Sequence, residues 1–410
     1  MLPQKSPFYV LRHSNFRLLW LGLFISRVGS EMQVVAINWH VYLLTGSAIS
    51  LGFIGLSRFL PVVVFSLLGG ITADLFNRKW IMLIAQLLMT LSALVLAFTT
   101  YAHNISPLVI YAMTAATAMA SVFDTPARQS VVPHLVPRQE FVKATGLNIT
   151  MWQTSIVLGP AIGGFLIAYF GVGSIYIINA VSFIAVIVAI LLINLPQRQL
   201  QQGTAFNWKS VVEGLRYVRR SPMIYSTMLL DFFATFFASA TVLMPIYAKD
   251  ILKVGAQGLG FLYAAPALGA IVAGLITSTY GHFKNQGRIL LVAVGIYGLA
   301  SALFGLSRLF YLSLALLMVA GAGDAVSSVI RNSIRQLRTP DYLRGRMVSI
   351  NQIFFMGGPQ LGEVEAGLVA GFVSAPFAVV SGGLATIVVT WAIAYFVPSV
   401  IGYKGEEIIV

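Results

Sequence analysis

Apolar runs about as long as a bilayer is thick recur along the whole chain, and they limit the fold more than any other feature. A helix needs about 20 mostly apolar residues to cross a bilayer. Little of a 410-residue chain with this pattern is left for a soluble domain. The sequence predicts an all-α membrane protein of twelve transmembrane helices, at about residues 17 to 44, 49 to 73, 80 to 101, 106 to 130, 141 to 169, 174 to 195, 223 to 248, 257 to 280, 289 to 307, 310 to 334, 345 to 371 and 376 to 398.

The composition excludes several classes of protein. Apolar residues make up 58% of the chain and charged residues 10%, against roughly 45–50% and 25% in soluble proteins. Without cysteine there is no disulfide, thiolate metal site or cysteine nucleophile. We find no P-loop, HExxH or nucleophile-elbow motif, and the five histidines are scattered. We therefore expect no enzyme, no metal site and no cofactor.

The net charge of +13 would suggest nucleic acid in a soluble chain, but here we interpret it as membrane topology and expect no nucleic-acid partner. Lys and Arg gather in alternate loops, as the positive-inside rule requires with both termini in the cytoplasm. The basic N-terminal segment continues into an apolar run without a cleavage site, so we expect an uncleaved first helix. Among the predicted cytoplasmic residues are Arg138, Arg216, Arg219, Arg220, Arg288, Arg331, Arg335 and Arg338, whereas Lys249, Lys253 and Arg308 fall on the other side.

A polar stretch near the middle divides the spans six and six. It predicts an N-terminal half over residues 1–195, a linker over 196–222 and a C-terminal half over 223–410. The linker contains an amphipathic helix that either lies on the inner membrane surface or packs on the bundle. Arg128 matches Arg331, and Asn148 matches Asn351, at an offset of 203 residues in equivalent parts of each half. These matches favour an internal duplication with substrate held between the halves.

Charged residues inside the predicted spans are few, and each needs a partner, a watery cavity or a function, because a central charge costs about 2.5–3.5 kcal/mol. Asp231 has no cation within one turn, so we interpret it as an isolated carboxylate that carries protons. Arg27 and Glu31 lie four residues apart and either pair structurally or take part in transport. The candidates for proton coupling or the substrate cavity are Arg27, Glu31, Arg58, Asp231 and Asp324.

The segment GGITADLFNRKW follows the second span. It resembles the loop motif of the major facilitator superfamily, although Leu75 and Asn77 replace the arginine and glycine often found there. The resemblance implies a cytoplasmic gate in which Asp74 binds Arg344 or Arg346; the alternative is an ordinary basic turn. The candidate gate residues are Gly70, Asp74, Arg78, Lys79, Asp124, Arg128, Arg344 and Arg346.

The fifth span carries small residues and a proline at Gly146, Ser155, Gly159, Pro160, Gly163 and Gly164. Small residues let helices approach backbone to backbone, and proline lets a helix bend. The spacing is similar to the glycine-rich motif of exporters in the same superfamily, and the alternative is plain helix packing.

Further stretches extend the resemblance over nearly the whole chain: SVFDTPARQSVVPHLVPRQEFVKATGLN, GLGFLYAAPALGAIVAG, LRGRMVSINQ and GGPQLGEVEAGLVAG. They look like the branch of drug:proton antiporters that contains the enterobactin exporter. The resemblance implies two pseudo-symmetric six-helix halves with spans one, four, seven and ten around a central cavity. Aromatic side chains in these spans are candidates for stacking on substrate, among them Phe24, Trp39, Phe232 and Phe236.

These observations favour a monomeric, proton-coupled exporter of drugs or siderophores in the bacterial inner membrane, working by alternating access. We expect its partners to be small amphiphilic substrates, protons and membrane lipid. Two alternatives remain: an importer or facilitator of a nutrient or metabolite, and a membrane receptor that transports nothing.

Overall fold

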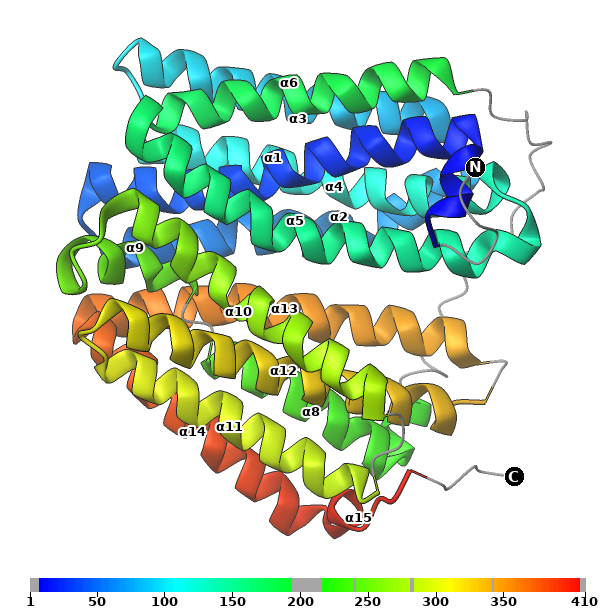
Figure 1. The fold of residues 1–410 in the computed structure, drawn as a ribbon, viewed down its shortest axis with the longest axis vertical. Helices are drawn as coiled ribbons and strands as arrows, with labels where there is room; N and C mark the ends of the chain where they lie inside the picture. The colour runs from blue at the N-terminus through cyan, green and yellow to red at the C-terminus, as the bar shows by residue number, and fades with distance from the viewer. Residues whose placement is uncertain (1–6, 194–215, 239–240, 281–283, 341–342, 406–410) are drawn as a thin grey trace. The chain divides into compact units, whose positions relative to one another are not determined.

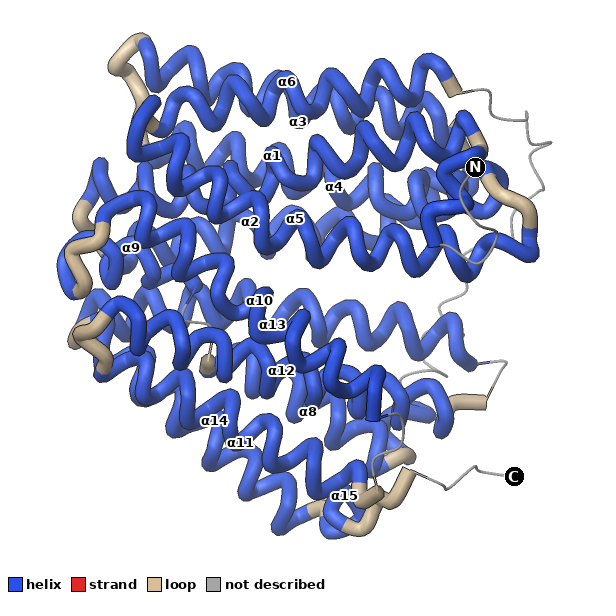
Figure 2. Tube along the Cα trace, viewed as in Figure 1, coloured by secondary structure: helices blue, strands red, loops and turns tan. Residues whose placement is uncertain are grey.

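The computed structural model describes residues 7–193, 216–238, 241–280, 284–340 and 343–405. Every regular element in these ranges is a helix (Figure 2). The elements, drawn in Figure 1, are the 3-10 helix η1 (Pro7–Arg12), α1 (Ser14–Thr45), α2 (Ala48–Leu75), α3 (Arg78–Tyr101), α4 (Pro107–Leu135), η2 (Arg138–Glu140), α5 (Phe141–Phe170), α6 (Val172–Leu192), α8 (Pro222–Phe237), η3 (Thr241–Leu243), α9 (Met244–Ile246), η4 (Tyr247–Ile251), α10 (Gly255–Tyr280), α11 (Gln286–Leu306), α12 (Phe310–Arg338), α13 (Arg344–Phe372), α14 (Ala375–Phe396) and α15 (Pro398–Ile401).

Eleven helices among the described residues are long and apolar enough to cross a membrane. They match eleven of the twelve predicted spans. The remaining predicted span coincides with α13, whose hydropathy is lowered by Gln360, Glu363 and Glu365. The all-α transmembrane fold predicted from hydropathy is confirmed.

Capping residues mark some of the helix ends. The Asn77 side chain accepts a hydrogen bond from the backbone N–H of Lys79 at 2.9 Å and so starts α3. Ser106 caps α4 in the same way, just before Pro107. At the end of α1, Gly46 adopts φ +58°, which a residue without Cβ does at little cost.

The chain divides into two compact units, which we describe separately. In the first, α1 packs against α5 and α6, and α3 packs against α4 and α6. In the second, α8 packs against α13 and α14, and α11 packs against α12 and α14. The same order of pairing therefore occurs in each unit. The first unit comprises Met1–Gly46, Ser57–Ala205 and Gly255–Gly260, and the second comprises Ser47–Leu56, Phe206–Val254 and Phe261–Val410.

The tenth predicted span ends too early in the sequence-based interpretation. Residue 334 was the predicted limit, whereas α12 continues to Arg338. Arg335, which lies beyond the predicted limit, is therefore helical and buried. Arg331, which was counted among the cytoplasmic residues, is helical and buried as well. Most of the predicted linker lies outside the described residues, but residues 216–220 are helical.

Backbone contact between α11 and α14 depends on glycine. A methyl group added at Gly298 would lie 2.7 Å from the carbonyl oxygen of Gly383, which is closer than carbon and oxygen can approach. On the same helix, a methyl group added at Gly295 would meet no atom within 4 Å.

We expect Gly298→Ala to destabilise the protein by about 1–3 kcal/mol, because the added methyl group pushes α11 and α14 apart. Unfolding of the purified protein in detergent, followed by circular dichroism, measures the change. Gly295→Ala is the matched control and should be neutral or slightly stabilising. Equal losses in the two variants would contradict the close contact.

Candidate functional site

Two aspartates and two arginines form a connected network of ion pairs inside the second unit. We call Asp231, Asp324, Arg331 and Arg335 the arginine–aspartate cluster. Nη2 of Arg331 lies 3.2 Å from Oδ1 of Asp231 and 3.1 Å from Oδ1 of Asp324. Nη1 of Arg335 lies 3.2 Å from Oδ2 of Asp231. Asp231 is thus held by both arginines, and Arg331 joins the two aspartates.

The spacing along α12 creates this arrangement. Asp324, Arg331 and Arg335 are seven and then four residues apart, so they fall on one side of the helix. Asp231 reaches them from α8, which packs against α12. Asp231 and Arg335 are 104 residues apart in the sequence, so the periodicity of a single helix does not predict their contact.

Arg335 also connects a third helix to the cluster. Its Nη1 donates to Oδ1 of Asn351 on α13, and its Nη2 donates to Oδ1 of Asn332 at 3.1 Å. Its Nε donates to the carbonyl oxygen of Arg331 at 3.2 Å. One guanidinium therefore holds α8, α12 and α13 together through charge-assisted hydrogen bonds.

The four members of the cluster differ in exposure. The side chains of Arg331, Asp231 and Arg335 are 0%, 3% and 5% exposed, whereas that of Asp324 is 38% exposed. Nε and Nη1 of Arg331 have no hydrogen-bond partner among the described residues. Two negative and two positive charges compensate each other, and Asp324 is the carboxylate that water reaches most easily.

The interpretation of Asp231 as an isolated carboxylate is wrong. It has no cation near it in the sequence, but the fold brings two from α12. Arg331 and Arg335 were missed as members of the site because they were counted as loop charges. Their spacing from Asp324 was the available signal, since it indicates one helix face.

We expect Asp231→Asn to destabilise the protein by about 3–5 kcal/mol, because the buried Arg335 loses its carboxylate and the buried Arg331 keeps only the more exposed Asp324. Denaturant unfolding in detergent measures this loss. Asp324→Asn, at the more exposed carboxylate, should cost clearly less. The double variant Asp231→Asn/Arg335→Gln should recover part of the stability, and a double variant less stable than Asp231→Asn would contradict the pairing.

In the first unit, Arg27 and Glu31 form an ion pair within α1. Nη2 of Arg27 lies 2.8 Å from Oε1 of Glu31, and the guanidinium lies 5.5 Å from the ring centre of Trp152 on α5. A methyl group at Gly159 would lie 2.9 Å from the carbonyl oxygen of Val28 and closer still to Cβ of Glu31. The glycine thus allows α5 to approach the helical turn that carries the charged pair.

The other small residues of this motif differ in their surroundings. Gly163 is close to Met32, where an added methyl group would lie 3.1 Å from Cα. Pro160 and Gly164 are buried in α5, and an added methyl group at Gly164 would collide with the backbone of Gly260. At Gly146 an added methyl group would meet nothing within 4 Å.

We expect Gly159→Ala to reduce stability by about 1–3 kcal/mol through the clash with α1. Gly146→Ala removes a glycine of the same motif and should have no such effect. Melting curves of the two variants in the same detergent provide the comparison. A Gly159→Ala protein as stable as the wild type would contradict the tight α1–α5 contact.

Several candidate gate residues have contacts within the first unit. Nε of Arg128 lies 3.3 Å from Oδ2 of Asp124, and Nε2 of Gln86 donates to Oδ1 of Asp124 at 3.2 Å. Arg78 donates to the carbonyl oxygen of Ser130 at 3.0 Å. Lys79 donates to the carbonyl oxygens of Leu191 and Ile193 at 3.0 and 3.1 Å, at the end of α6.

The predicted partners of the gate are not all described. Gly70 and Asp74 lie in α2, and Arg344 and Arg346 lie in α13. The surroundings of these four residues lie outside the described part of the structure. The proposed contact of Asp74 with either arginine stays a prediction.

The remaining candidates are distributed over both units. Arg58 is half-buried in α2, Phe24 stacks on Trp20 with ring centres 5.6 Å apart, and Trp39 is buried. On α8, Phe232 and Phe236 stack at 5.8 Å, and Phe232 also meets Phe354 of α13 edge-on at 6.2 Å. An aromatic surface therefore extends along α8 beside the arginine–aspartate cluster.

Comparisons of the sequence with known proteins agree with one another. The profile of the transmembrane secretion effector family matches residues 5–401. The enterobactin exporter EntS of Shigella boydii is 29% identical over 340 residues, which cover 82% of this chain and 80% of that protein. EntS of Escherichia coli gives the same identity and coverage.

Solved structures with the same arrangement of helices are also transporters. A variant of the nucleoside transporter NupG has a TM-score of 0.73 at 13% identity and covers 94% of this chain and 100% of its own. A bacterial homologue of the iron transporter ferroportin, in an inward-facing state, has a TM-score of 0.70 at 14% identity and covers 93% and 98%. At these identities the likeness concerns the fold alone.

Proposed function

Because this chain belongs to the transmembrane secretion effector family of major facilitator transporters, we propose that it exports small amphiphilic compounds across the bacterial inner membrane in exchange for protons. The family consists of transporters, so the chain is a multi-pass membrane transporter and not an enzyme. Similarity to EntS supports export as the direction and makes siderophores one substrate class to test. The proposal places both termini in the cytoplasm and uses alternating access between the two units.

The proton coupling rests on one observation, the link from the part-exposed Asp324 through Arg331 to the buried Asp231. Oδ2 of Asp231 accepts hydrogen bonds from Arg335, and its Oδ1 lies 3.2 Å from Nη2 of Arg331. Asp324 pairs with one arginine, Arg331, and its side chain is more exposed than that of Asp231. Asp324 can therefore exchange a proton with water while Asp231 keeps both arginines in place. We therefore assign proton exchange to Asp324 and the holding of the arginines to Asp231.

Protonation of Asp324 changes the charge balance of the cluster. With both aspartates ionised, the four side chains sum to zero; with Asp324 protonated, they carry one net positive charge. Arg331 then has Asp231 as its sole anionic partner among the described residues. Because an uncompensated charge is costly in a low-dielectric interior, the protonated and deprotonated forms favour different side-chain arrangements.

The amphiphilic substrate class is supported by the aromatic surface on α8. Phe232 and Phe236 are half-buried and lie one turn apart, in the same helix as Asp231. Aromatic rings bind planar or amphiphilic molecules through apolar contact and stacking. The cluster and these rings together provide one polar and one apolar surface within the second unit.

Transport into inverted membrane vesicles tests the function. The panel contains amphiphilic dyes, drugs and iron-free siderophores, each assayed with a proton gradient and after its collapse by an ionophore. Accumulation that requires both the protein and the gradient is the expected result. Gradient-driven loss of substrate from the vesicles would indicate import, and no movement of any compound would argue against amphiphile export.

We expect Asp324→Asn to abolish gradient-dependent accumulation while downhill exchange of substrate continues, because the variant cannot release a proton at this position. Counterflow in the absence of a gradient measures the exchange. Asp250→Asn, at an exposed carboxylate in η4, is the control and should transport like the wild type. Full gradient-driven transport by Asp324→Asn would remove this residue from proton coupling.

A further inference from the structure

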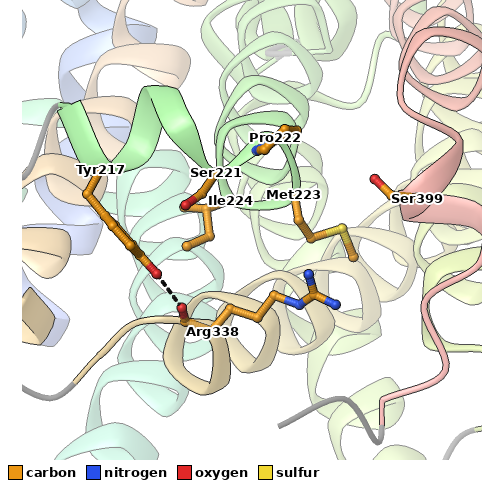
Figure 3. A pocket seen from close by; sticks show the side chains of 7 residues that line it. All are labelled: Tyr217, Ser221, Pro222, Met223, Ile224, Arg338 and Ser399. Carbon is orange, nitrogen blue, oxygen red and sulfur yellow. Dashed lines mark hydrogen bonds between the residues drawn. The ribbon is translucent and has the colours of Figure 1, made fainter. Parts of the chain in front are cut away.

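A cavity of about 290 Å³ lies where α8 begins and α12 ends, and its described lining contains no member of the arginine–aspartate cluster. Figure 3 shows its lining from close by. The side chains come from the segment before α8, from the first turn of α8, and from the ends of α12 and α15. They are Tyr217, Ser221, Pro222, Met223, Ile224, Arg338 and Ser399.

Arg338 gives the cavity its charge. Its guanidinium lies over the ring of Tyr403, 5.3 Å from the ring centre. The hydroxyl of Tyr217 donates to the carbonyl oxygen of Arg338 at 2.6 Å, as drawn in Figure 3, and so fixes the last turn of α12 beside the segment before α8. A guanidinium stacked on an aromatic ring still directs its N–H donors outward in its own plane, where they suit phosphate oxygens.

The rest of the lining combines hydroxyl and apolar groups. Ser221 precedes α8 and its side chain makes no capping hydrogen bond, and Ser399 is exposed. Met223 and Ile224 supply apolar surface beside them. None of the lining residues in the described part of the chain carries a carboxylate. Donors and one cation next to apolar side chains match the boundary between a lipid headgroup and its acyl chains.

The position of the cavity agrees with this chemistry. The membrane-spanning helices that border it start at Pro222 and end at Arg338, so the cavity lies at the membrane–water interface. Arg216, Arg219 and Arg220 are exposed in the segment that leads to α8. Basic side chains near a membrane surface attract anionic lipids by about 1 kcal/mol each. A cavity of this size holds a headgroup and not a whole lipid.

We propose that this cavity binds the phosphate of an anionic headgroup at the inner surface of the membrane, with Arg338 as the principal contact. Ser221 and Ser399 supply further donors to the phosphate oxygens. The same chemistry accepts a soluble phosphate ion, so the source of the phosphate is part of the test. The site is independent of the direction and energy source of transport.

The test uses the purified full-length protein in a mild detergent. Its melting temperature is recorded while short-chain phosphatidylglycerol, phosphatidylcholine or inorganic phosphate is added. Saturable stabilisation by phosphatidylglycerol, with an apparent dissociation constant about fivefold weaker in Arg338→Gln, is the expected result. Stabilisation by inorganic phosphate with the same dependence on Arg338 would support the phosphate site and identify its occupant as a soluble anion.

Two further variants separate a built pocket from general surface charge. Ser399→Trp keeps every charge but fills the cavity, and it should weaken the response to phosphatidylglycerol as Arg338→Gln does. Arg138→Gln removes an exposed arginine of the first unit and should respond like the wild type. Equal weakening in Arg138→Gln, a full response in Ser399→Trp, or equal stabilisation by phosphatidylcholine would each overturn the proposal.

Discussion

The cost of placing charge in an apolar interior governs the second unit of this protein. Arg331 is fully buried, and it can be so because Asp231 and Asp324 surround one of its nitrogens. Arg335 extends the same set of contacts to Asn351 and thereby to α13. Helices that would otherwise be held by apolar and glycine contacts are thus also joined by directional polar bonds, which specify one arrangement of α8, α12 and α13.

The two units compensate the charged side chains inside their helices in different ways. Their helices pack in the same pairwise order, as an internal duplication requires. In the first unit, however, Glu31 neutralises Arg27 from one turn away on the same helix, and Asp124 meets Arg128 in the same manner on α4. In the second unit the pairing crosses between helices. In the first unit these two pairs compensate charge within a single helix. In the second unit the charges of α12 are compensated in part by Asp231 of α8.

Hydropathy predicted nearly all of the fold, because an apolar run of about 20 residues identifies a membrane-spanning helix without any information from the rest of the chain. The four-residue spacing of Arg27 and Glu31 likewise predicts their pair, because both residues fall on one face of one helix. The partners of Asp231 were beyond such reasoning. They lie about a hundred residues away, and hydropathy ended the tenth span before Arg335, since a run of arginines at a helix end looks like the start of a loop.

The burial of Arg331 also limits how this sequence can change over time. Replacing Asp231 with a neutral residue leaves two buried arginines with one fewer carboxylate, which lowers stability at once. Replacing the arginines first leaves the carboxylate of Asp231 buried without a cation. Neutral drift at these positions therefore has to pass through a weakened intermediate or alter both helices together. Divergent copies of such a transporter should keep the set intact or lose it whole, and intermediate combinations should be rare.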